Sequence, residues 1–239
     1  MDFTRTRYRL LLKQLKKSGY QFITYSMYCE GKAPDRFVIL RHDVVRNPLN
    51  ALRIAKEEEA YRAKVTFYFR AVPECWNEKK VIDMAWMGHE IGYLYESLVT
   101  CQGNTEKAYE DFCHHLEELQ KVCDMKTICA NDSLHSSYDN KDLWKEHDYK
   151  TLGIVGEPYL TTDFSKMLYL SDAGRRWDGY KHDSILGYQE QWKEKGWSFH
   201  STNDIIQALR EDRLPDQLMI TTHPHLWNDF GWNWLKEKF

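Results

Sequence analysis

The sequence predicts an α/β protein built as a single (β/α) barrel. Two observations support this fold class: short apolar or β-branched runs alternate with helical stretches, and polar residues follow one predicted strand after another. The 239 residues, of which 42% are hydrophobic, are enough to bury the core of one such domain. Because no repeat, low-complexity tract or proline-rich linker marks a boundary, we treat residues 1–239 as one domain.

The N-terminal stretch MDFTRTRYRLLLKQLKKSGY predicts an amphipathic helix, because Arg and Lys are interleaved with apolar residues. A signal peptide would need an uninterrupted apolar segment instead. We interpret residues 1–30 as an N-terminal helical extension, and favour a core-facing helix that ends at Gly19 over a helix resting on a membrane surface. No apolar run approaches the ~20 residues that span a bilayer, so we expect no membrane span and a cytoplasmic location.

Eight strands are expected after this helix, in residues 37–42, 65–69, 90–95, 127–130, 152–155, 167–170, 198–200 and 218–222. Several of the helices between them begin at recognisable caps. Asn47 with Pro48 supplies a cap residue and a first-turn proline, Asn104 opens another helix, and Ser201 with Asp204 forms a capping box.

The composition excludes some classes of partner. A formal net charge of −3 without a basic block argues against nucleic acid or an anionic membrane as the main partner. The six cysteines form no CxxC pair and no zinc-finger spacing, so we interpret them as reduced thiols in or near the core. The sequence does not give the oligomeric state; the aromatic stretch 225–239 is a candidate interface, with core packing as its more ordinary explanation.

Polar residues stand directly after most of the predicted strands. In a (β/α) barrel these positions form one face, on which catalytic groups are mounted. The pattern therefore predicts a shared pocket made by His42-Asp43, Arg70, Glu96, Asn131-Asp132, Glu157, Asp172 and His223.

Several motifs appear in a fixed order along the chain, namely LRHDV, TFYFR, GHEIGYLYESL, SSYDNKDLW, YKTLGIVGEPYL, YLSDAGRRWDG and MITTHPHLW. Together they resemble the polysaccharide deacetylase (NodB homology, family 4 carbohydrate esterase) superfamily, in particular a bacterial branch that opens with Arg-His-Asp-Val-Asp. The likeness runs from Phe37 to Trp227. It implies a distorted (β/α) barrel that uses a divalent metal, often zinc, to remove N- or O-linked acetyl groups from sugars.

The resemblance implies roles for four residues. Asp43 matches the general base that acts on metal-bound water, and His223 matches the general acid that protonates the leaving amine. Asp172 and Arg175 match an Asp and an Arg that orient the catalytic groups, although Ala173 stands where a threonine is usual. The residues alone also allow simpler roles: Asp43 as a cap or as the partner of Arg175, His223 as a core histidine, and Asp172 with Arg175 as a structural ion pair.

The metal-ligand positions that the resemblance implies carry Val45, Leu94, Leu98 and Asn131. Zinc needs thiolate, imidazole or carboxylate donors, and valine and leucine have no lone pair to offer. We therefore expect that the ancestral zinc or other divalent metal is lost, and we assign no metal ligand and no cofactor. A relocated site remains an alternative, built from three of His42, Asp43, Glu96, Asp132, His135 and His223.

The substrate expected from the resemblance is an acetylated sugar or polysaccharide precursor. Candidate substrate-binding residues are Arg41, His42, Glu96, Asp132, His135, Glu157, Trp177 and Trp227. The two tryptophans could stack on sugar rings, although core or rim packing is the more usual role of a tryptophan.

Two functions follow from the resemblance. The first is a hydrolase that deacetylates N-acetylated sugars of a bacterial surface polysaccharide with a degenerate metal site, using Asp43 as base and His223 as acid. The second is a catalytically inactive relative that binds a carbohydrate or a partner protein in polysaccharide biosynthesis. The aliphatic residues at 45, 94 and 98 favour the second, whereas Asp43, Asp172, Arg175 and His223 favour the first.

Overall fold

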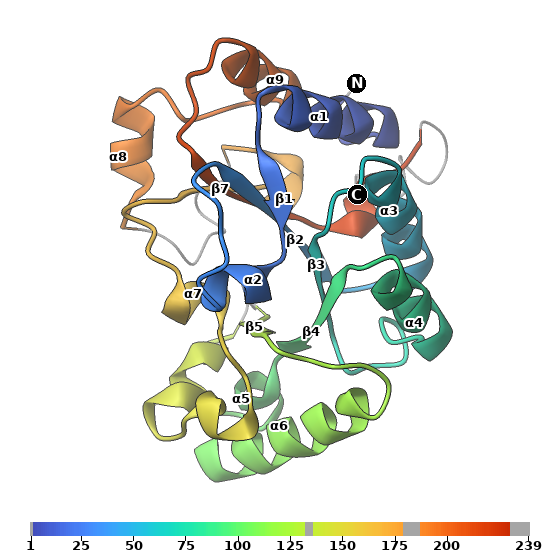
Figure 1. Ribbon diagram of the computed structural model, residues 1–239. Coiled ribbons are helices and arrows are strands. Elements are labelled where there is room, and N and C mark those ends of the chain that lie inside the picture. Colours follow the sequence, from blue (N-terminus) through green and yellow to red (C-terminus); the bar gives the residue numbers. More distant parts are fainter. Residues whose placement is uncertain (1, 132–135, 179–186, 230–239) are drawn as a thin grey trace.

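The computed structural model describes residues 2–131, 136–178 and 187–229, and in these residues a curled parallel sheet is surrounded by helices (Figure 1). All strand pairs are parallel, and the order along the sheet is β5-β4-β3-β2-β7-β6. The strands are β1 (Gln21–Ile23), β2 (Phe37–Val44), β3 (Thr66–Phe69), β4 (Glu90–Tyr95), β5 (Ile128–Ala130), β6 (Leu168–Ser171) and β7 (Gln217–Thr222).

Strand β2 lies at the centre and has three partners. Its first half pairs with β1, in the register Gln21↔Phe37, and its second half pairs with β3, in the register Arg41↔Thr66. Strand β7 runs along the other side of β2 from Phe37 to His42. The carboxyl end of β2 therefore lies between the ends of β3 and β7.

The helices follow the strands in the βα order that the sequence predicts. The α-helices are α1 (Arg5–Lys17), α2 (Tyr25–Cys29), α3 (Pro48–Ala60), α4 (Glu78–Trp86), α5 (Ser97–Thr100), α6 (Thr105–Gln120), α7 (Pro158–Thr161), α8 (Gln189–Glu194) and α9 (Thr202–Arg210). Short 3₁₀ helices include η1 (Asn140–Lys145), η2 (Tyr149–Leu152), η3 (Ala173–Arg175) and η5 (Pro224–Leu226).

The predicted caps are confirmed. Asn47 accepts a hydrogen bond from the backbone N–H of Asn50 at the start of α3, and Asn104 does the same for Lys107 at the start of α6. Ser201 and Asp204 form the expected capping box of α9. These side chains satisfy backbone donors that the first turn of a helix leaves unpaired.

The amphipathic N-terminal helix is also confirmed, and its apolar face is part of the core. It begins after the cap Thr4 and ends at Lys17, two residues before Gly19. Its buried side chains are Tyr8, Leu11, Leu12 and Leu15, each 0% exposed. Helix α1 packs beside α9 (Figure 1).

Two predicted strands do not form. In residues 152–155 the chain leaves η2 through Gly153, which has a φ of 79°, and only an isolated bridge joins Thr127 to Gly156. Residues 198–200 precede α9 without forming a strand, and the short strand β1 was not predicted. Within the described residues the sheet thus ends at β5 and β6, so the parallel α/β fold is confirmed as a half-barrel and a complete barrel is not.

The buried apolar residues form two clusters. The larger one takes residues from both faces of the sheet, such as Val38 and Ile39 of β2, whereas a small cluster on the concave face consists of Tyr68, Leu94 and Cys129, with Val45 and Tyr159 against it. Glycine is required at one position of this face: a Cβ on Gly92 would lie 2.5 Å from the Tyr68 ring. The ring crosses Gly92 so that the Tyr68 hydroxyl can meet Thr127, at 2.9 Å.

All six cysteines are free thiols, as the sequence predicts. Across the described part of the chain, no helix has both the length and the apolar character that a membrane crossing requires.

Candidate functional site

The carboxyl ends of the strands carry polar side chains that form three groups. Arg41 and Asp43 lie at the end of β2, Asp172 and His223 follow β6 and β7, and a third group follows β3, β4 and β5. Because parallel strands end at one edge of a sheet, residues that are 26 to 51 positions apart along the chain form hydrogen bonds here.

The first group is a buried ion pair. The Arg41 guanidinium donates from Nε to Oδ1 of Asp43 at 2.9 Å and from Nη2 to Oδ2 at 2.6 Å. Both side chains point to the concave face because they are two residues apart on a strand. This bidentate geometry occupies both carboxylate oxygens of the residue predicted as general base.

Arg41 is held from the other side by Tyr159. Its Nη2 donates to the Tyr159 hydroxyl at 2.7 Å, and its guanidinium lies over the Tyr159 ring, 4.6 Å from the centroid. The side chain is 1% exposed, and within the described residues its Nη1 has no hydrogen-bond partner. A permanent positive charge thus stands inside the curl of the sheet, directly beside Asp43.

The second group is an Asp–His pair. The fully buried carboxylate of Asp172 is 2.6 Å from Nδ1 of His223 and also accepts hydrogen bonds from the His223 backbone N–H and from the Trp227 indole. Four contacts therefore fix both the carboxylate and the imidazole ring. The His223 side chain is 22% exposed, so solvent reaches the ring although its partner is buried.

The pKa of His223 is raised above its ordinary value. Burial acts to lower the pKa, but the charge and hydrogen bond of Asp172 outweigh it, with a further contribution from Asp43. The charge of Arg41 opposes this increase. Because His42 pairs with Thr222 in the sheet, the carboxyl ends of β2 and β7 lie side by side, with Asp43 and His223 as the next residues of the two strands.

Arg175 does not have the carboxylate partners that the sequence suggested. Its Nη2 donates to the Leu226 carbonyl at 3.2 Å, while Asp43 is engaged by Arg41 and Asp172 by His223 and Trp227. The expected Asp172–Arg175 ion pair is therefore wrong. The two residues are joined through the backbone instead, by the Arg175 N–H and the Asp172 carbonyl at 2.9 Å.

The third group joins the ends of three strands. Arg70 holds Glu96 with three contacts between 2.6 and 3.1 Å, and the other end of the carboxylate accepts a hydrogen bond from Asn131 at 2.7 Å. Arg70 also donates to the Val45 carbonyl at 3.3 Å. Glu96 was predicted as substrate-binding; its side chain is 26% exposed, so its charge is partly open to solvent but already paired.

The residues at the implied metal-ligand positions do not fit a zinc ion. Val45 and Leu94 pack together in the small apolar cluster with Tyr68 and Cys129, and Leu98 is buried in the main core. Asn131 is the only polar side chain of that set, and it is occupied by Glu96. Within the described residues, no group of three or more His, Cys, Asp or Glu side chains could hold a metal ion.

His42 lies on the opposite face of β2 from Arg41 and Asp43. Its Nε2 is 2.7 Å from Oε1 of Glu58 on α3, and its Nδ1 is 2.6 Å from the Thr222 hydroxyl. The ring is 0% exposed, because strand alternation directs it between the sheet and the helices. The prediction that His42 binds substrate is therefore wrong for this structure, and alternation along FVILRHDV was the signal against it.

Neither tryptophan can act as a platform for a sugar ring. Trp177 is 3% exposed and donates to the Thr202 hydroxyl, and Trp227 is 0% exposed and donates to Asp172. Both pack around Phe3. The substrate-binding prediction is thus wrong for both residues, since stacking on a sugar needs an accessible aromatic face.

Glu157 has a structural position. Its fully buried carboxylate accepts hydrogen bonds from the backbone N–H groups of Ala130, Tyr159 and Leu160, so it caps α7 and ties that helix to the end of β5. Burial raises its pKa to about 7, although the three N–H donors and the charge of Arg41 favour the ionised form. No surface of Glu157 is open to a substrate.

The two other predicted substrate-binding residues, Asp132 and His135, lie outside the described residues, as does most of the aromatic C-terminal stretch. The sequence reasoning missed Tyr159, which meets Arg41, and Glu58, which meets His42. Nothing local in EPYL or KEEEA distinguishes these residues from ordinary surface positions, because their partners lie 118 and 16 residues away along the chain.

Comparison with protein-family models, with curated proteins and with solved structures found no match to this chain. The deacetylase resemblance therefore rests on the motifs of the sequence and stays a prediction.

Proposed function

We propose that this chain is a polysaccharide deacetylase-like protein that binds an acetylated carbohydrate without metal-dependent turnover. The observation that carries the proposal is the Arg41–Asp43 ion pair beside an apolar cluster that contains Val45 and Leu94. The two guanidinium N–H donors each take a lone pair on one oxygen of Asp43, and so use part of the capacity that a general base offers to the proton of water.

Charge balance supports the same proposal. A metal ion would bring two positive charges to the end of β2, where Arg41 already neutralises Asp43 in a buried setting. Desolvating a second cation there, with aliphatic side chains at 45 and 94, would be costly. The partly exposed groups around this centre, which are His223, Glu96 and Arg70, offer hydrogen bonds of the kind that sugar hydroxyls and acetamido groups use.

The proposal also includes a partner and a location for the protein. The partner is an acetylated sugar of a bacterial surface polysaccharide or its precursor, and the place of action is the cytoplasm, where the six free thiols would stay reduced. The carbohydrate class rests on the family resemblance alone.

The test uses the full chain purified without a metal-affinity tag. We expect calorimetry to detect binding of oligosaccharides of N-acetylglucosamine but not of the matched glucosamine oligosaccharides. The binding should weaken in Glu96→Gln and persist in Glu117→Gln, an exposed glutamate of α6 that serves as the control. We also expect no bound zinc by mass spectrometry after loading with excess zinc; one zinc per chain, or acetate release that a chelator abolishes, would overturn the proposal.

A second candidate function, slow metal-free hydrolysis, is favoured by the Asp172–His223 pair. Asp172 holds Nδ1 of His223, which leaves Nε2 of a solvent-accessible ring to accept a proton from water. Water without a metal has a pKa of about 15.7 instead of about 7, so turnover would be slow. Acetate release that is insensitive to chelators and lost in His223→Gln would establish this function.

A further inference from the structure

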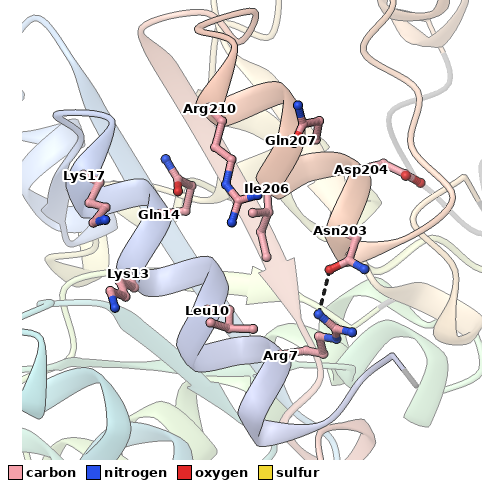
Figure 2. A pocket seen from close by; sticks show the side chains of 10 residues that line it. All are labelled: Arg7, Leu10, Lys13, Gln14, Lys17, Asn203, Asp204, Ile206, Gln207 and Arg210. Atoms are coloured by element: carbon pink, nitrogen blue, oxygen red, sulfur yellow. Dashed lines mark hydrogen bonds between the residues drawn. The ribbon is translucent and has the colours of Figure 1, made fainter.

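A groove on the surface of the molecule is lined by side chains of the neighbouring helices α1 and α9 (Figure 2). Its volume is about 520 Å³. Small-molecule sites typically enclose roughly 300 to 1,000 Å³, so the groove has room for one small ligand. None of its lining residues belongs to the site at the carboxyl ends of the strands.

Four cationic side chains line the groove in a chain whose net charge is −3: Arg7, Lys13 and Lys17 from α1 and Arg210 from α9. Arg7 reaches across from α1 and donates to the Asn203 side chain at 2.8 Å. Figure 2 shows Arg210 extending between the two helices. Among the described residues, Lys13, Lys17 and Arg210 form no ion pair, so their charges are not neutralised by the protein there.

The acidic residue of the lining does not cancel these charges. The Asp204 carboxylate accepts hydrogen bonds from the backbone N–H groups of Ser201 and His200, at 2.8 and 3.2 Å, as part of the α9 capping box. In Figure 2 its side chain points away from α1. The groove is therefore a positively charged surface.

The lining also has a part suited to an uncharged group. Leu10 is 41% exposed and offers the groove an apolar side chain, whereas Ile206 on α9 is only 4% exposed. The amide side chains of Gln14 and Gln207 add donors and acceptors to the lining. Such a lining combines charge for an anion with apolar and amide contacts for an organic ring.

We propose that this groove binds a small phosphorylated organic molecule, with its phosphate groups on Arg7, Arg210 and the two lysines, and its uncharged part on Leu10. Arginine forks match the oxygens of a phosphate, and several cations match a ligand with two or more negative charges. The size of the groove and the negative net charge of the chain favour a small ligand over a nucleic acid.

Calorimetry with the full chain at low salt tests the proposal, with ADP, inorganic pyrophosphate and adenosine as probes. We expect ADP to bind with a sub-millimolar Kd, pyrophosphate to bind more weakly and adenosine not to bind. Arg210→Gln and Leu10→Glu should each weaken ADP binding on the order of tenfold, the first by removing a cation and the second by replacing the exposed apolar side chain with an acid. Both positions are exposed, so the fold should be retained, which thermal unfolding would check.

Lys56→Gln is the matched control, because Lys56 is an exposed lysine of α3 outside the groove. Absence of saturable pyrophosphate and ADP binding, or an equal loss in Lys56→Gln, would overturn the proposal. Equal affinities for ADP and pyrophosphate would overturn the role given to Leu10. Because acetylated-sugar binding should be unchanged in Arg210→Gln, this result is independent of the proposed function.

Discussion

Within the LRHDV motif, Arg41 is the residue that most constrains Asp43. It supplies a fixed positive charge that pairs with Asp43, and Tyr159 completes its hydrogen bonding on one side. A buried ion pair contributes little net stability when intact, but the loss of one partner leaves an uncompensated charge. The structural importance of Asp43 can therefore be separated from catalysis by comparing single and double substitutions.

We expect Asp43→Asn to lower the free energy of unfolding by about 3 to 5 kcal/mol, because it leaves the Arg41 guanidinium buried without a counter-ion. The double variant Arg41→Met with Asp43→Leu should recover most of that loss. Urea denaturation of the natural chain and of these two variants measures the loss and its recovery. A fully stable Asp43→Asn protein would contradict the structural role and favour a purely catalytic one.

His225 gives a second prediction at the residue scale, for stability at acid pH. Its ring is 7% exposed; burial, with the charges of His223, Arg46 and Arg175, lowers its pKa from 6.5 to about 3. Below pH 6.5 His225 becomes protonated in the unfolded chain but stays neutral in the folded chain. The free energy of unfolding therefore falls as the pH falls. The loss is about 1.4 kcal/mol for each pH unit until the folded-state pKa is reached.

We therefore expect His225→Gln to lose less stability than the natural chain between pH 6.5 and pH 4.5, by about 2 kcal/mol. Denaturation midpoints at several pH values would measure the difference. The two proteins should show similar pH dependence above pH 7, and parallel curves at acid pH would contradict the assignment to His225.

At the scale of elements, the sequence predicts an element well where the signal is local. Caps such as Asn47 and Ser201 and the run FVIL were sufficient to locate α3, α9 and β2. The segment 152–155 failed because Gly153 takes a left-handed conformation that ends η2, which apolar character alone does not reveal. Strand β1 was missed because three residues carry too little periodicity, and its pairing with β2 is not local.

For the candidate site, the sequence indicates which edge of the sheet a residue occupies, but not which partner it meets. The position of a residue after a strand indicates the edge of the sheet at which it lies, so Asp172 and His223 were correctly placed at one edge. Whether a side chain is paired or buried depends on residues far away in the sequence. The tryptophans and His42 were misjudged on this account, since Trp177 meets Phe3 and His42 meets Glu58.

Helix α7 provides a prediction at the element scale. Glu157 accepts three backbone N–H groups, from Ala130 of β5 and from Tyr159 and Leu160 of α7. In Glu157→Gln the side-chain amide nitrogen cannot accept a hydrogen bond, so at least one buried N–H loses its partner. We expect a loss of about 1 to 3 kcal/mol near neutral pH by urea denaturation.

The pH dependence of that variant gives its control. Because burial raises the pKa of Glu157 to about 7, ionisation of this group in the unfolded chain lowers stability as the pH rises from 4.5 to 7. A glutamine cannot ionise, so the variant should lose less stability than the natural chain over this interval. An identical pH dependence would show that Glu157 is ionised in both states.

At the scale of the whole molecule, α1 closes the core over the helix-facing side of β2. Tyr8 donates to Glu58, which also holds His42, and packs edge-on against Trp227. The N-terminal segment therefore joins α3, β2 and the region after β7 (Figure 1).

We expect a chain that lacks residues 1–18 to lose its cooperative fold. Each of the four buried side chains of α1 contributes about 1.5 to 3 kcal/mol, and whole domains are stable by only about 5 to 15 kcal/mol. Loss of the near-ultraviolet circular dichroism signal and binding of a hydrophobic dye would report this outcome. Lys13→Ala, a substitution at an exposed position of the same helix, should leave both signals unchanged.

The position of β2 between β3 and β7 has a consequence for biosynthesis. While the ribosome makes the chain, β2 can pair with β1 and β3 early, but its other edge must wait until β7, about 180 residues later, has been synthesised. During that interval one edge of the apolar strand β2 has no partner strand. Unpaired strand edges of this kind are the surfaces through which incompletely folded chains aggregate. The protein should therefore depend on chaperones in the cell more than its finished structure suggests.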